Sequence, residues 1–414
     1  MENERKITVA TKRVGVLIGG SGLIGGTLLH YFKTRTNDDI EILAPNSKHL
    51  SLREPEDIQQ YFRKFKPDFI INTAITAIDS DPQIAFEVNY LGSINLAKTA
   101  AEMNIPYIHF SSAAIMPIGE NLSEDDVLPL SPKMSNYAKS KLMAELTLKH
   151  LREKQGLDYS VVRMAVVYGK HDHKIQGFHR LLFSILNQAM PLMFTKRGVK
   201  HSFSSARKVP FFVHHMLNNR DKYSGQTYDF VDRQPVELSK LILTIKSYMK
   251  LSMPKKIYVP YLLAVPGKYF VAQIIKGLIK IGIDTRMPGE LMFLDKFYKS
   301  QTFSSEKLDS SGFVDPVPKI TIYSELPDLI QYYLTRWEQL NLITRYKKEF
   351  FDSKRWDEEF LHSPAALIES IHNGIVDPFA KSADPRKQAD SRQEPSGAVA
   401  RPPSTADHFD DLKS

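Results

Sequence analysis

The sequence predicts an α/β protein built on a doubly wound parallel sheet, and three observations support this prediction. A short apolar strand, Val14 to Ile18, runs directly into a glycine-rich turn. Beyond the turn, apolar strand-like runs alternate with segments of helical spacing. The strand-like runs at 68–72 and 105–112 are followed by or end in small polar residues. Alternation of this kind is typical of parallel sheets, which bind ligands at the carboxyl ends of their strands.

The glycine-rich turn spaces Gly19, Gly22 and Gly25 three residues apart. The first permits a tight turn, the second lets a phosphate approach the backbone, and the third lets a helix pack closely on the strand. The first N–H groups of that helix favour an anion. The turn therefore predicts a dinucleotide site, with a glycine-rich turn without a ligand as the alternative. The candidate cofactor-binding residues here are Gly19, Ser21, Gly22, Leu23, Ile24 and Gly25.

Composition limits the classes of function. The chain has 414 residues, enough for two domains, and its 42% hydrophobic and 25% charged residues are ordinary. Cysteine is absent, which excludes disulfides and thiolate chemistry. We expect a cytoplasmic protein, because the sequence shows neither a signal-peptide core nor an apolar run long enough to span a membrane. The net charge of +8 favours anionic substrates or a membrane surface over nucleic acid, for which no motif is present.

The elements expected after the turn follow in a regular order. Each is assigned from apolar runs, helical spacing and stop signals. They are a strand at 40–44, a helix at 54–65, a strand at 68–72, a helix at 85–101, a strand at 105–112, a polar loop at 119–132, a long helix capped by Ser135 or Asn136, and a strand at 159–169.

The strand at 40–44 bears on the choice between NAD and NADP. A dinucleotide-binding strand in this place often ends in an acid that holds the adenosine ribose. Here the sequence runs IEILAPNSK, without an acid at that end. This leaves room for the 2′-phosphate of NADP with Lys48 as its partner, although a solvent-exposed loop lysine is the alternative. Thr73 and Ala74, after the strand at 68–72, are small enough for a cofactor to lie over them.

Tyr137 and Lys141 lie four residues apart in Y-A-K-S-K, on one face of the long helix. A nearby ammonium favours a phenolate, so we expect Lys141 to lower the pKa of the Tyr137 phenol. Ser112 ends the strand at 105–112, where its hydroxyl could stabilise charge on a substrate oxygen. An ordinary surface pair is the alternative for the tyrosine and lysine. For Ser112 the alternative is Ser111, whose side chain points to the other face.

Together these pieces resemble the extended short-chain dehydrogenases/reductases, the family of nucleotide-sugar epimerases, dehydratases and reductases. The segment from Arg53 to Asn89 is especially similar to dTDP-4-dehydrorhamnose reductases, and the resemblance covers roughly residues 13 to 320. The matching motifs stand in family order: GGSGLIG, INTA at 71–74, VN at 88–89, FSSA at 110–113, YAKSK at 137–141, and Arg163 followed by VVYG at 166–169.

The resemblance implies a Rossmann domain that binds NAD or NADP and a hydride transfer assisted by three side chains. Tyr137 would give or take the proton, Ser112 would hold the substrate oxygen, and Lys141 would also hold the nicotinamide ribose. Asn89 resembles the family asparagine that braces the helix near the lysine. Arg163 is a candidate substrate contact, with a structural ion pair as the alternative.

Departures from the family pattern limit the assignment of a substrate. Ala113 and Ala114 stand where the dehydratases carry an Asp-Glu pair, which argues against dehydration. The Thr-Asp-Tyr of rhamnose reductases and the epimerase tyrosine near Met116 are also missing. The resemblance thus implies a reductase or epimerase of a nucleotide-sugar or similar small-molecule keto substrate. A non-catalytic NADP-binding regulatory subunit and a hydroxysteroid-type dehydrogenase for a lipid-like substrate are the alternatives.

The second half is expected to form a smaller substrate domain. Arg207 belongs to a basic cluster in a region that contacts the diphosphate of a nucleotide-sugar in related enzymes, and a solvated basic loop is equally open. The other members of the cluster are Lys196, Arg197, Lys200 and Lys208. The loop residues His171, His173 and His179 have a spacing that is weak for a metal site, so no metal is expected.

Pro260 to Ile283 predicts an amphipathic helix, which begins after Pro266 and Gly267 and has lysines on one side. Such a stripe more often faces the core, and docking on an anionic membrane through 266–283 is the alternative. The expected organisation is a Rossmann domain, a substrate domain interleaved with it, a helical extension that packs on the enzyme or on a second subunit of a homodimer, and a disordered tail. Their ranges are 13–170, 171–325, 326–380 and 381–414.

Overall fold

The fold is known from a computed structural model, which describes residues 12–36, 39–186, 195, 197–253, 260–280, 294–340 and 342–343, together with 364, 365, 368 and 372. The chain divides into two compact units, Met1–Glu325 and Leu326–Ser414. The first unit contains every sheet of the described residues and the candidate site. Helix α14 (Ile322–Gln339) crosses the boundary between the units.

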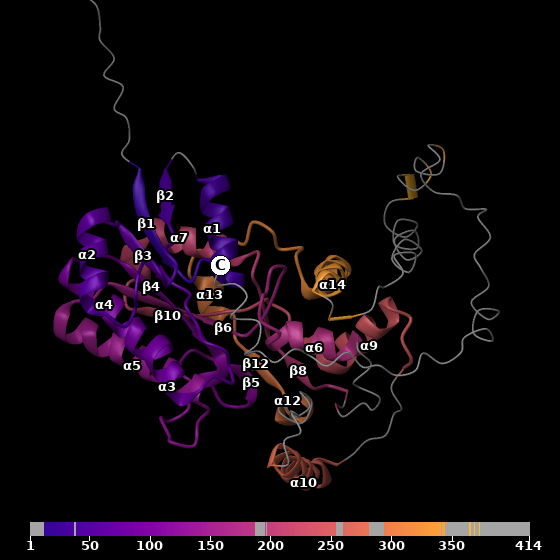
Figure 1. Cartoon of the computed structure of the whole chain (residues 1–414). Coiled ribbons are helices and arrows are strands. Elements are labelled where there is room, and N and C mark those ends of the chain that lie inside the picture. The colour runs from indigo at the N-terminus through magenta and orange to yellow at the C-terminus, as the bar shows by residue number, and fades with distance from the viewer. Residues whose placement is uncertain are drawn as a thin grey trace, which may run out of the picture. The chain divides into compact units, whose positions relative to one another are not determined.

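The first unit is organised on a six-stranded sheet with the order β10-β6-β4-β3-β1-β2 (Figure 1). All neighbouring strands in it run parallel. The order reverses between β1 and β3, and ligands of such sheets bind where the strand order reverses. The predicted doubly wound parallel sheet is therefore confirmed. Its strands are β1 (Arg13–Ile18), β2 (Ile40–Leu43), β3 (Phe69–Asn72), β4 (Tyr107–Ser112), β6 (Tyr159–Met164) and β10 (Gln226–Phe230).

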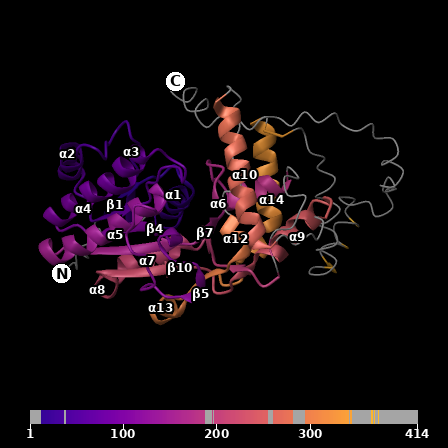
Figure 2. The ribbon, with the colours of Figure 1, turned by 90° about the horizontal axis from the view of Figure 1, so that it is seen from below.

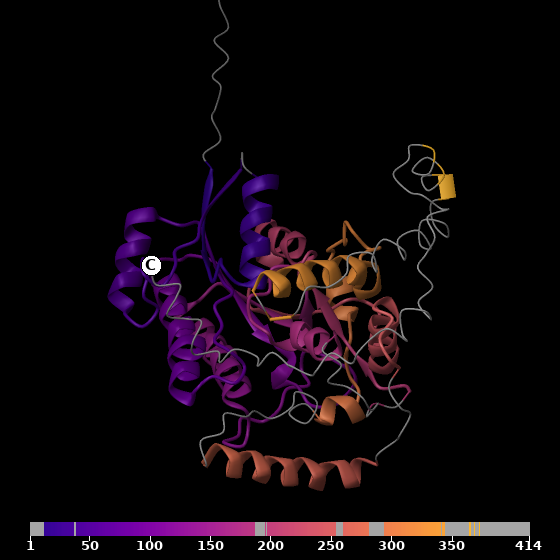
Figure 3. The ribbon, with the colours of Figure 1, turned by 45° about the vertical axis from the view of Figure 1, so that its right-hand side comes forward.

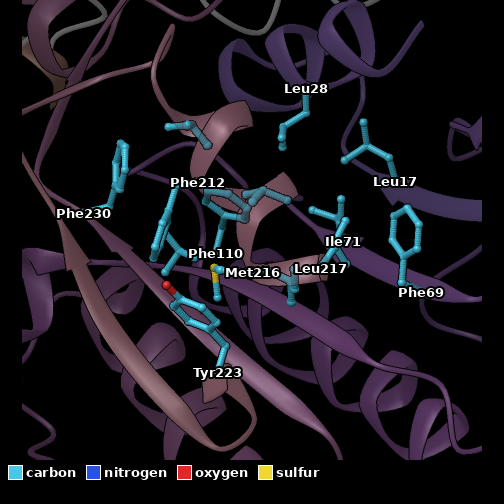
Figure 4. Close-up of a cluster of buried hydrophobic side chains, with 14 of the residues drawn as sticks. Leu17, Leu28, Phe69, Ile71, Phe110, Phe212, Met216, Leu217, Tyr223 and Phe230 are labelled. Carbon is cyan, nitrogen blue, oxygen red and sulfur yellow. The ribbon is translucent and has the colours of Figure 1, made fainter. Parts of the chain in front are cut away.

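Helices cover both faces of this sheet, as Figures 1 and 2 show from two sides. On one face, Leu28 of α1 (Leu23–Arg35) shares a core with Phe212 and Met216 of α7 (Val209–Asn218) (Figure 4). Phe32 of α1 belongs to the same core. The other face packs on three helices, α2 (Pro55–Phe65), α4 (Gly92–Glu102) and α5 (Asn136–Gln155). A parallel sheet requires this double cover, because its strands are apolar on both faces.

Two smaller sheets join parts of the chain that are far apart in sequence. One has the order β11-β8-β12-β5 and the other pairs β7 with β9. Strand β5 comes from the first half of the chain, whereas β10 of the large sheet comes from the second half. The two halves are thus interleaved. The strands are β5 (Gly119–Leu122), β7 (Val166–Tyr168), β8 (Lys200–His201), β9 (Phe203–Ser205), β11 (Val236–Glu237) and β12 (Gln301–Phe303).

Three local expectations differ from the structure. The polar loop expected at 119–132 begins with β5, because Gly119 pairs with the distant Gln301. The single strand expected at 159–169 is split at Ala165, whose N–H donates to the hydroxyl of Ser204. The helix expected at 85–101 starts with a π-helix, η1 (Ala85–Leu91), before α4 begins.

The expected amphipathic helix is α10 (Tyr261–Lys280). Pro266 lies inside it and does not precede it, and Phe270 is among its exposed apolar side chains. The more common core-facing interpretation is therefore wrong. The expected tail at 381–414 lies outside the described residues. The remaining elements are α3 (Pro82–Ile84), η2 (Ala113–Ile115), α6 (Gly177–Leu186), α8 (Arg220–Tyr223), α9 (Leu238–Tyr248), α12 (Leu294–Tyr298) and α13 (Glu306–Ser310).

No helix within the described ranges has both the length and the apolar character needed to cross a membrane.

We predict that Gly15→Ala destabilises the large sheet. A Cβ on Gly15 would lie 2.3 Å from ring carbons of Phe69 and 2.7 Å from Cδ1 of Ile42, both buried. Overpacking of this kind should lower the free energy of unfolding by about 1 to 3 kcal/mol, measured by urea denaturation. Gly277→Ala on α10 is the control, because its Cβ would meet no atom within 4 Å. Equal midpoints for Gly15→Ala and the parent protein would contradict the prediction.

Candidate active site

The glycine turn joins β1 to α1 through very close backbone contacts. Gly19 has φ +85°, a conformation that favours glycine, and its carbonyl oxygen accepts the N–H of Gly22 at 3.0 Å. A Cβ on Gly25 would lie 2.1 Å from the same oxygen. A Cβ on Gly22, by contrast, would meet nothing but that oxygen, at 3.5 Å. The turn is thus tight beneath Gly25 and open at Gly22, which fits the approach of a phosphate.

The start of α1 has no capping side chain. Its N-cap is Gly22, and no side chain accepts a hydrogen bond from the first turn. Ser21 is exposed and Leu23 and Ile24 are half-buried, so the amide groups at this end are near the surface. The unpaired N–H groups of a helix start favour an anion. The candidate residues Ser21, Leu23 and Ile24 therefore surround a backbone surface suited to a pyrophosphate.

Residues after β3 form the other side of this turn. The Thr73 hydroxyl donates to the carbonyl oxygen of Ile18 at 2.8 Å, and the Thr73 N–H donates to the same oxygen. A Cβ on Gly19 would lie 2.7 Å from this hydroxyl. The N–H of Ala74 donates to Oδ1 of Asn72. The ends of β1 and β3 are thus held together at the reversal of strand order. The contact of Thr73 and Ala74 with a cofactor stays a prediction.

The segment after β2 forms a turn around Asn46. Its side-chain oxygen accepts the N–H of Lys48 at 2.9 Å and lies 2.8 Å from Nδ1 of His49. The side chains of Ser47, Lys48 and His49 are exposed. The turn therefore offers a cation and a hydroxyl, and no acid, where the adenosine ribose would lie.

Ser112 and Tyr137 meet at the carboxyl end of β4. The hydroxyl of Ser135 accepts the N–H of Ala138, which confirms Ser135 as the N-cap of α5 and places Tyr137 in its first turn. The Tyr137 side chain is 8% exposed. Burial raises the pKa of its phenol, and a hydrogen bond with the Ser112 side chain partly offsets this rise. By contrast, Ser111 is buried with no hydrogen-bond partner for its hydroxyl. Of the two serines, Ser112 is thus the one beside Tyr137, and its catalytic role stays a prediction.

Lys141 lies one turn further along α5 and is 2% exposed. Its Nζ donates to the carbonyl oxygen of Phe110 at 2.8 Å. Burial lowers the pKa of the Lys141 ammonium to about 8, while the charge of Glu145 acts in the opposite direction. The expected lowering of the Tyr137 pKa by Lys141 is not found, because burial of the phenol dominates and raises it.

Asn89 connects the segment after β3 to α5. Its Oδ1 accepts the N–H of Thr76 at 2.9 Å, and its Nδ2 donates to the hydroxyl of Ser140 at 3.2 Å. Ser140 directly precedes Lys141 and bonds in turn to the carbonyl oxygen of Tyr137. Asn89 is fully buried in the π-helix η1. These bonds match the bracing role expected for Asn89.

The two candidate substrate arginines have different surroundings. Arg163 is buried, and its guanidinium donates to both carboxylate oxygens of Glu145 at 2.8 to 3.1 Å. It also donates to the carbonyl oxygen of Glu124 at 2.6 Å. This is the structural ion pair, so the substrate contact through Arg163 finds no support. Arg207 has a side chain 63% exposed and pairs with Glu325 at 2.6 Å. Its contact with a substrate stays a prediction.

One further member of the basic cluster, Lys208, forms two ion pairs. Lys208 is buried and pairs with Asp232 at 3.5 Å and Asp315 at 3.0 Å, while Lys196 lies outside the described residues. His179 is buried on α6. Within the ranges that the structure describes, no group of three His, Cys, Asp or Glu side chains is placed to hold a metal.

Sequence reasoning missed three residues that support the site. Glu145 pairs with Arg163 and acts on Lys141, and its spacing of four residues from Lys141 on one helix was the available signal. Thr76 and Ser140 bond Asn89 across distances in sequence that no local pattern reveals.

The chain matches a known protein family over more than half of its length. Residues 16–229, more than half of the chain, match the NAD dependent epimerase/dehydratase family. The chain is 25% identical over 227 residues to GDP-L-colitose synthase of Yersinia pseudotuberculosis, covering 50% of this chain and 73% of that protein. It is 28% identical over 177 residues to the sterol-4-alpha-carboxylate 3-dehydrogenase erg26 of Schizosaccharomyces pombe, covering 39% and 52% of the two chains.

The fold is also similar to that of a solved reductase. The crystal structure of dTDP-4-dehydrorhamnose reductase from Bacillus anthracis in complex with NADP aligns with a TM-score of 0.52 and 18% identity. The alignment covers 74% of this chain and 94% of that one. The predicted family resemblance and the cofactor class, NAD or NADP, are thus confirmed.

We predict that Lys141→Met makes the protein more stable at pH 7. The folded-state pKa of about 8 lies below the ordinary 10.5, so folding at pH 7 must bury a charge. Each pKa unit corresponds to about 1.4 kcal/mol, and the substitution should raise the free energy of unfolding by about 1 to 3 kcal/mol.

The pH dependence of stability tests whether the buried charge of Lys141 destabilises the fold. Deprotonation of Lys141 favours the folded state, so the stability of the parent protein should rise between pH 8 and 10.5 and the advantage of the variant should shrink. Lys149→Met, at an exposed position of the same helix, should show neither effect. A variant that is less stable than the parent at pH 7 would contradict the prediction.

Proposed function

We propose that this chain, which belongs to the NAD-dependent epimerase/dehydratase family, is an NADP-dependent reductase of a keto sugar linked to a nucleotide. The observation that supports this most is the meeting of Ser112 and Tyr137, with Lys141 one turn further along α5. Because the sheet is parallel, this group stands at the same edge as the glycine turn. Reduction of a carbonyl group needs a proton donor and a dinucleotide-binding site close together, and both lie at this edge of the sheet.

The side chains divide the work of reduction between them. Bound NADPH supplies the hydride to the carbonyl carbon of the substrate. Tyr137 gives its phenolic proton to the carbonyl oxygen, and the Ser112 hydroxyl donates a hydrogen bond to that oxygen. The raised pKa keeps the Tyr137 phenol protonated at neutral pH, which suits a proton donor in reduction. Substrate oxidation would need the phenolate, and burial disfavours it.

Lys141 supports both the cofactor and the proton donor. An ammonium has three N–H donors, and the carbonyl oxygen of Phe110 accepts one of them. The others would reach the ribose hydroxyls of the nicotinamide half and stabilise the phenolate that Tyr137 becomes. A pKa of about 8 leaves most of the lysine charged at pH 7.

The preference for NADP and for a nucleotide-sugar rests on two further regions. The turn after β2 presents Lys48 and no acid, which suits a 2′-phosphate. GDP-L-colitose synthase and dTDP-4-dehydrorhamnose reductase, by their names, use nucleotide-linked sugars. The exposed Arg207 would exchange its partner Glu325 for a diphosphate oxygen. Ala113 and Ala114 leave no carboxylate for the elimination of water.

A lipid-like keto substrate is the second candidate. The similarity to a sterol-4-alpha-carboxylate 3-dehydrogenase and the exposed apolar side chains of α10 favour it. Steady-state assays with both classes of substrate distinguish the two, because the true class should saturate the enzyme.

We predict that Tyr137→Phe lowers the rate of substrate reduction by at least about a hundredfold, because the phenylalanine has no proton to give. Ser112→Ala should lower the rate of substrate reduction by a smaller factor, roughly tenfold or more, because one hydrogen bond to the substrate oxygen is lost. Cofactor affinity, measured by the fluorescence of bound NADPH, should stay within about twofold in both variants.

Tyr61→Phe, a partly buried tyrosine on α2, is the matched control and should keep full activity. An unchanged rate in Tyr137→Phe would overturn the mechanism. NADPH binding without turnover of either class of substrate would identify the protein as a non-catalytic, regulatory subunit.

We predict that Lys48→Glu raises the KM for NADPH about five- to tenfold and leaves the KM for NADH unchanged, because only NADPH carries the 2′-phosphate. Lys64→Glu, at an exposed position of α2, should change neither. A purified protein that retains stoichiometric NAD, as an epimerase would, contradicts the assignment as a reductase.

A further inference from the structure

Helix α10 exposes large apolar side chains along its length. Leu262 is 83% exposed and Phe270 is 69% exposed, values that are rare for such residues on a helix of a folded domain. Figures 1 and 3 show α10 apart from both larger sheets. The other exposed apolar members are Leu263, Tyr269 and Ile274.

These side chains share one face of the helix. Leu262 and Tyr269 are seven residues apart, as are Leu263 and Phe270, and Ile274 follows four residues after Phe270. Spacings of four and seven residues return to the same side of an α-helix. The small Ala264, on the other side, is the buried residue of the first turn. The helix therefore turns its larger apolar side chains away from the protein body.

The first turn of α10 is attached to the protein body through α12. The Tyr261 hydroxyl donates to Asp295, and the Tyr261 ring lies 5.3 Å from the ring of Tyr298. The carbonyl oxygen of Lys296 on α12 accepts a hydrogen bond from the His201 ring, which belongs to β8. Helix α12 thus holds one end of α10 and is itself bonded to β8, while the apolar face of α10 is left uncovered by the described residues.

The segment that contains α10 is rich in lysine and lacks acidic residues. Residues 238–283 contain no Asp and no Glu. Lys276 is exposed on α10 at the margin of the apolar face, seven residues after Tyr269. This segment carries eight lysines: Lys240, Lys246, Lys250, Lys255, Lys256, Lys268, Lys276 and Lys280. A surface that binds α10 should therefore have an apolar layer that accepts its apolar side chains and an anionic layer that pairs with its lysine side.

We propose that α10 docks in the plane of an anionic lipid bilayer, with Leu262, Tyr269 and Phe270 inserted below the headgroups and the exposed Lys276 facing the lipid phosphates. Apolar side chains on one face and lysines around it are the features by which interfacial helices bind such membranes. A second copy of the chain fits less well, because a two-fold contact would bring two lysine-rich segments together. This proposal does not depend on the reaction that the protein catalyses.

Vesicle flotation of the full chain tests the proposal. The protein should float with vesicles of phosphatidylcholine and phosphatidylglycerol, bind far less to phosphatidylcholine alone, and dissociate as salt is added. The double substitution L262Q/F270Q should weaken binding to the anionic vesicles at least about tenfold, because two inserted side chains are lost. K276E should weaken it also, by a smaller factor.

V314Q is the matched control, because Val314 is 81% exposed and lies outside α10. It should bind as the parent protein does, and circular dichroism should show the same fold in every variant. Failure of the parent protein to bind anionic vesicles, or equal binding by L262Q/F270Q, would overturn the proposal. So would a dimer in sedimentation that L262Q/F270Q converts to a monomer without any effect of vesicles, since this face would then be an interface between copies.

Discussion

The contact between Gly25 and the carbonyl oxygen of Gly19 is the constraint on which the candidate site depends. A side chain at Gly25 would begin 2.1 Å from that oxygen, so glycine alone lets α1 pack directly on the end of β1. Thr73 closes the same turn from the end of β3. Because every strand of the sheet runs parallel, the end of β4 with Ser112 lies at this edge as well. One close backbone contact thus aligns an anion-favouring helix start with a pair of hydroxyls.

Local patterns were enough to predict the parallel sheet, the glycine turn and the placing of Tyr137 and Lys141 on one helix, because apolar periodicity and motif spacing can be recognised within short stretches of sequence. They were not enough for β5, whose partner Gln301 is far away in the sequence. The environment of Arg163 was also undecided, because its partners Glu145 and Glu124 lie on other elements. Such features depend on tertiary contacts and desolvation, which a single sequence does not display.

Buried charge concentrates around this site. Lys141 has its pKa lowered to about 8 by burial, and burial raises the pKa of Asp229, 3.7 Å from Arg163, to about 7. Burial dominates for Asp229 despite the nearby guanidinium, and no hydrogen-bond donor reaches its carboxylate oxygens. Ionised groups held this way reduce stability, so they persist where chemistry or position requires them. The arrangement suits a site in which shifted pKa values serve the chemistry at a cost in folding stability.

The interleaving of the two halves has a consequence for how the chain folds as it is made. Strand β6 is bordered on one side by β10, which ends at Phe230, and β5 pairs with β12, which ends at Phe303. A nascent chain that has emerged only as far as β6 would expose an unpaired, apolar strand edge on the ribosome. Such edges recruit other chains. Premature termination before residue 230 should therefore yield aggregates and targets for chaperones, not a folded cofactor-binding fragment.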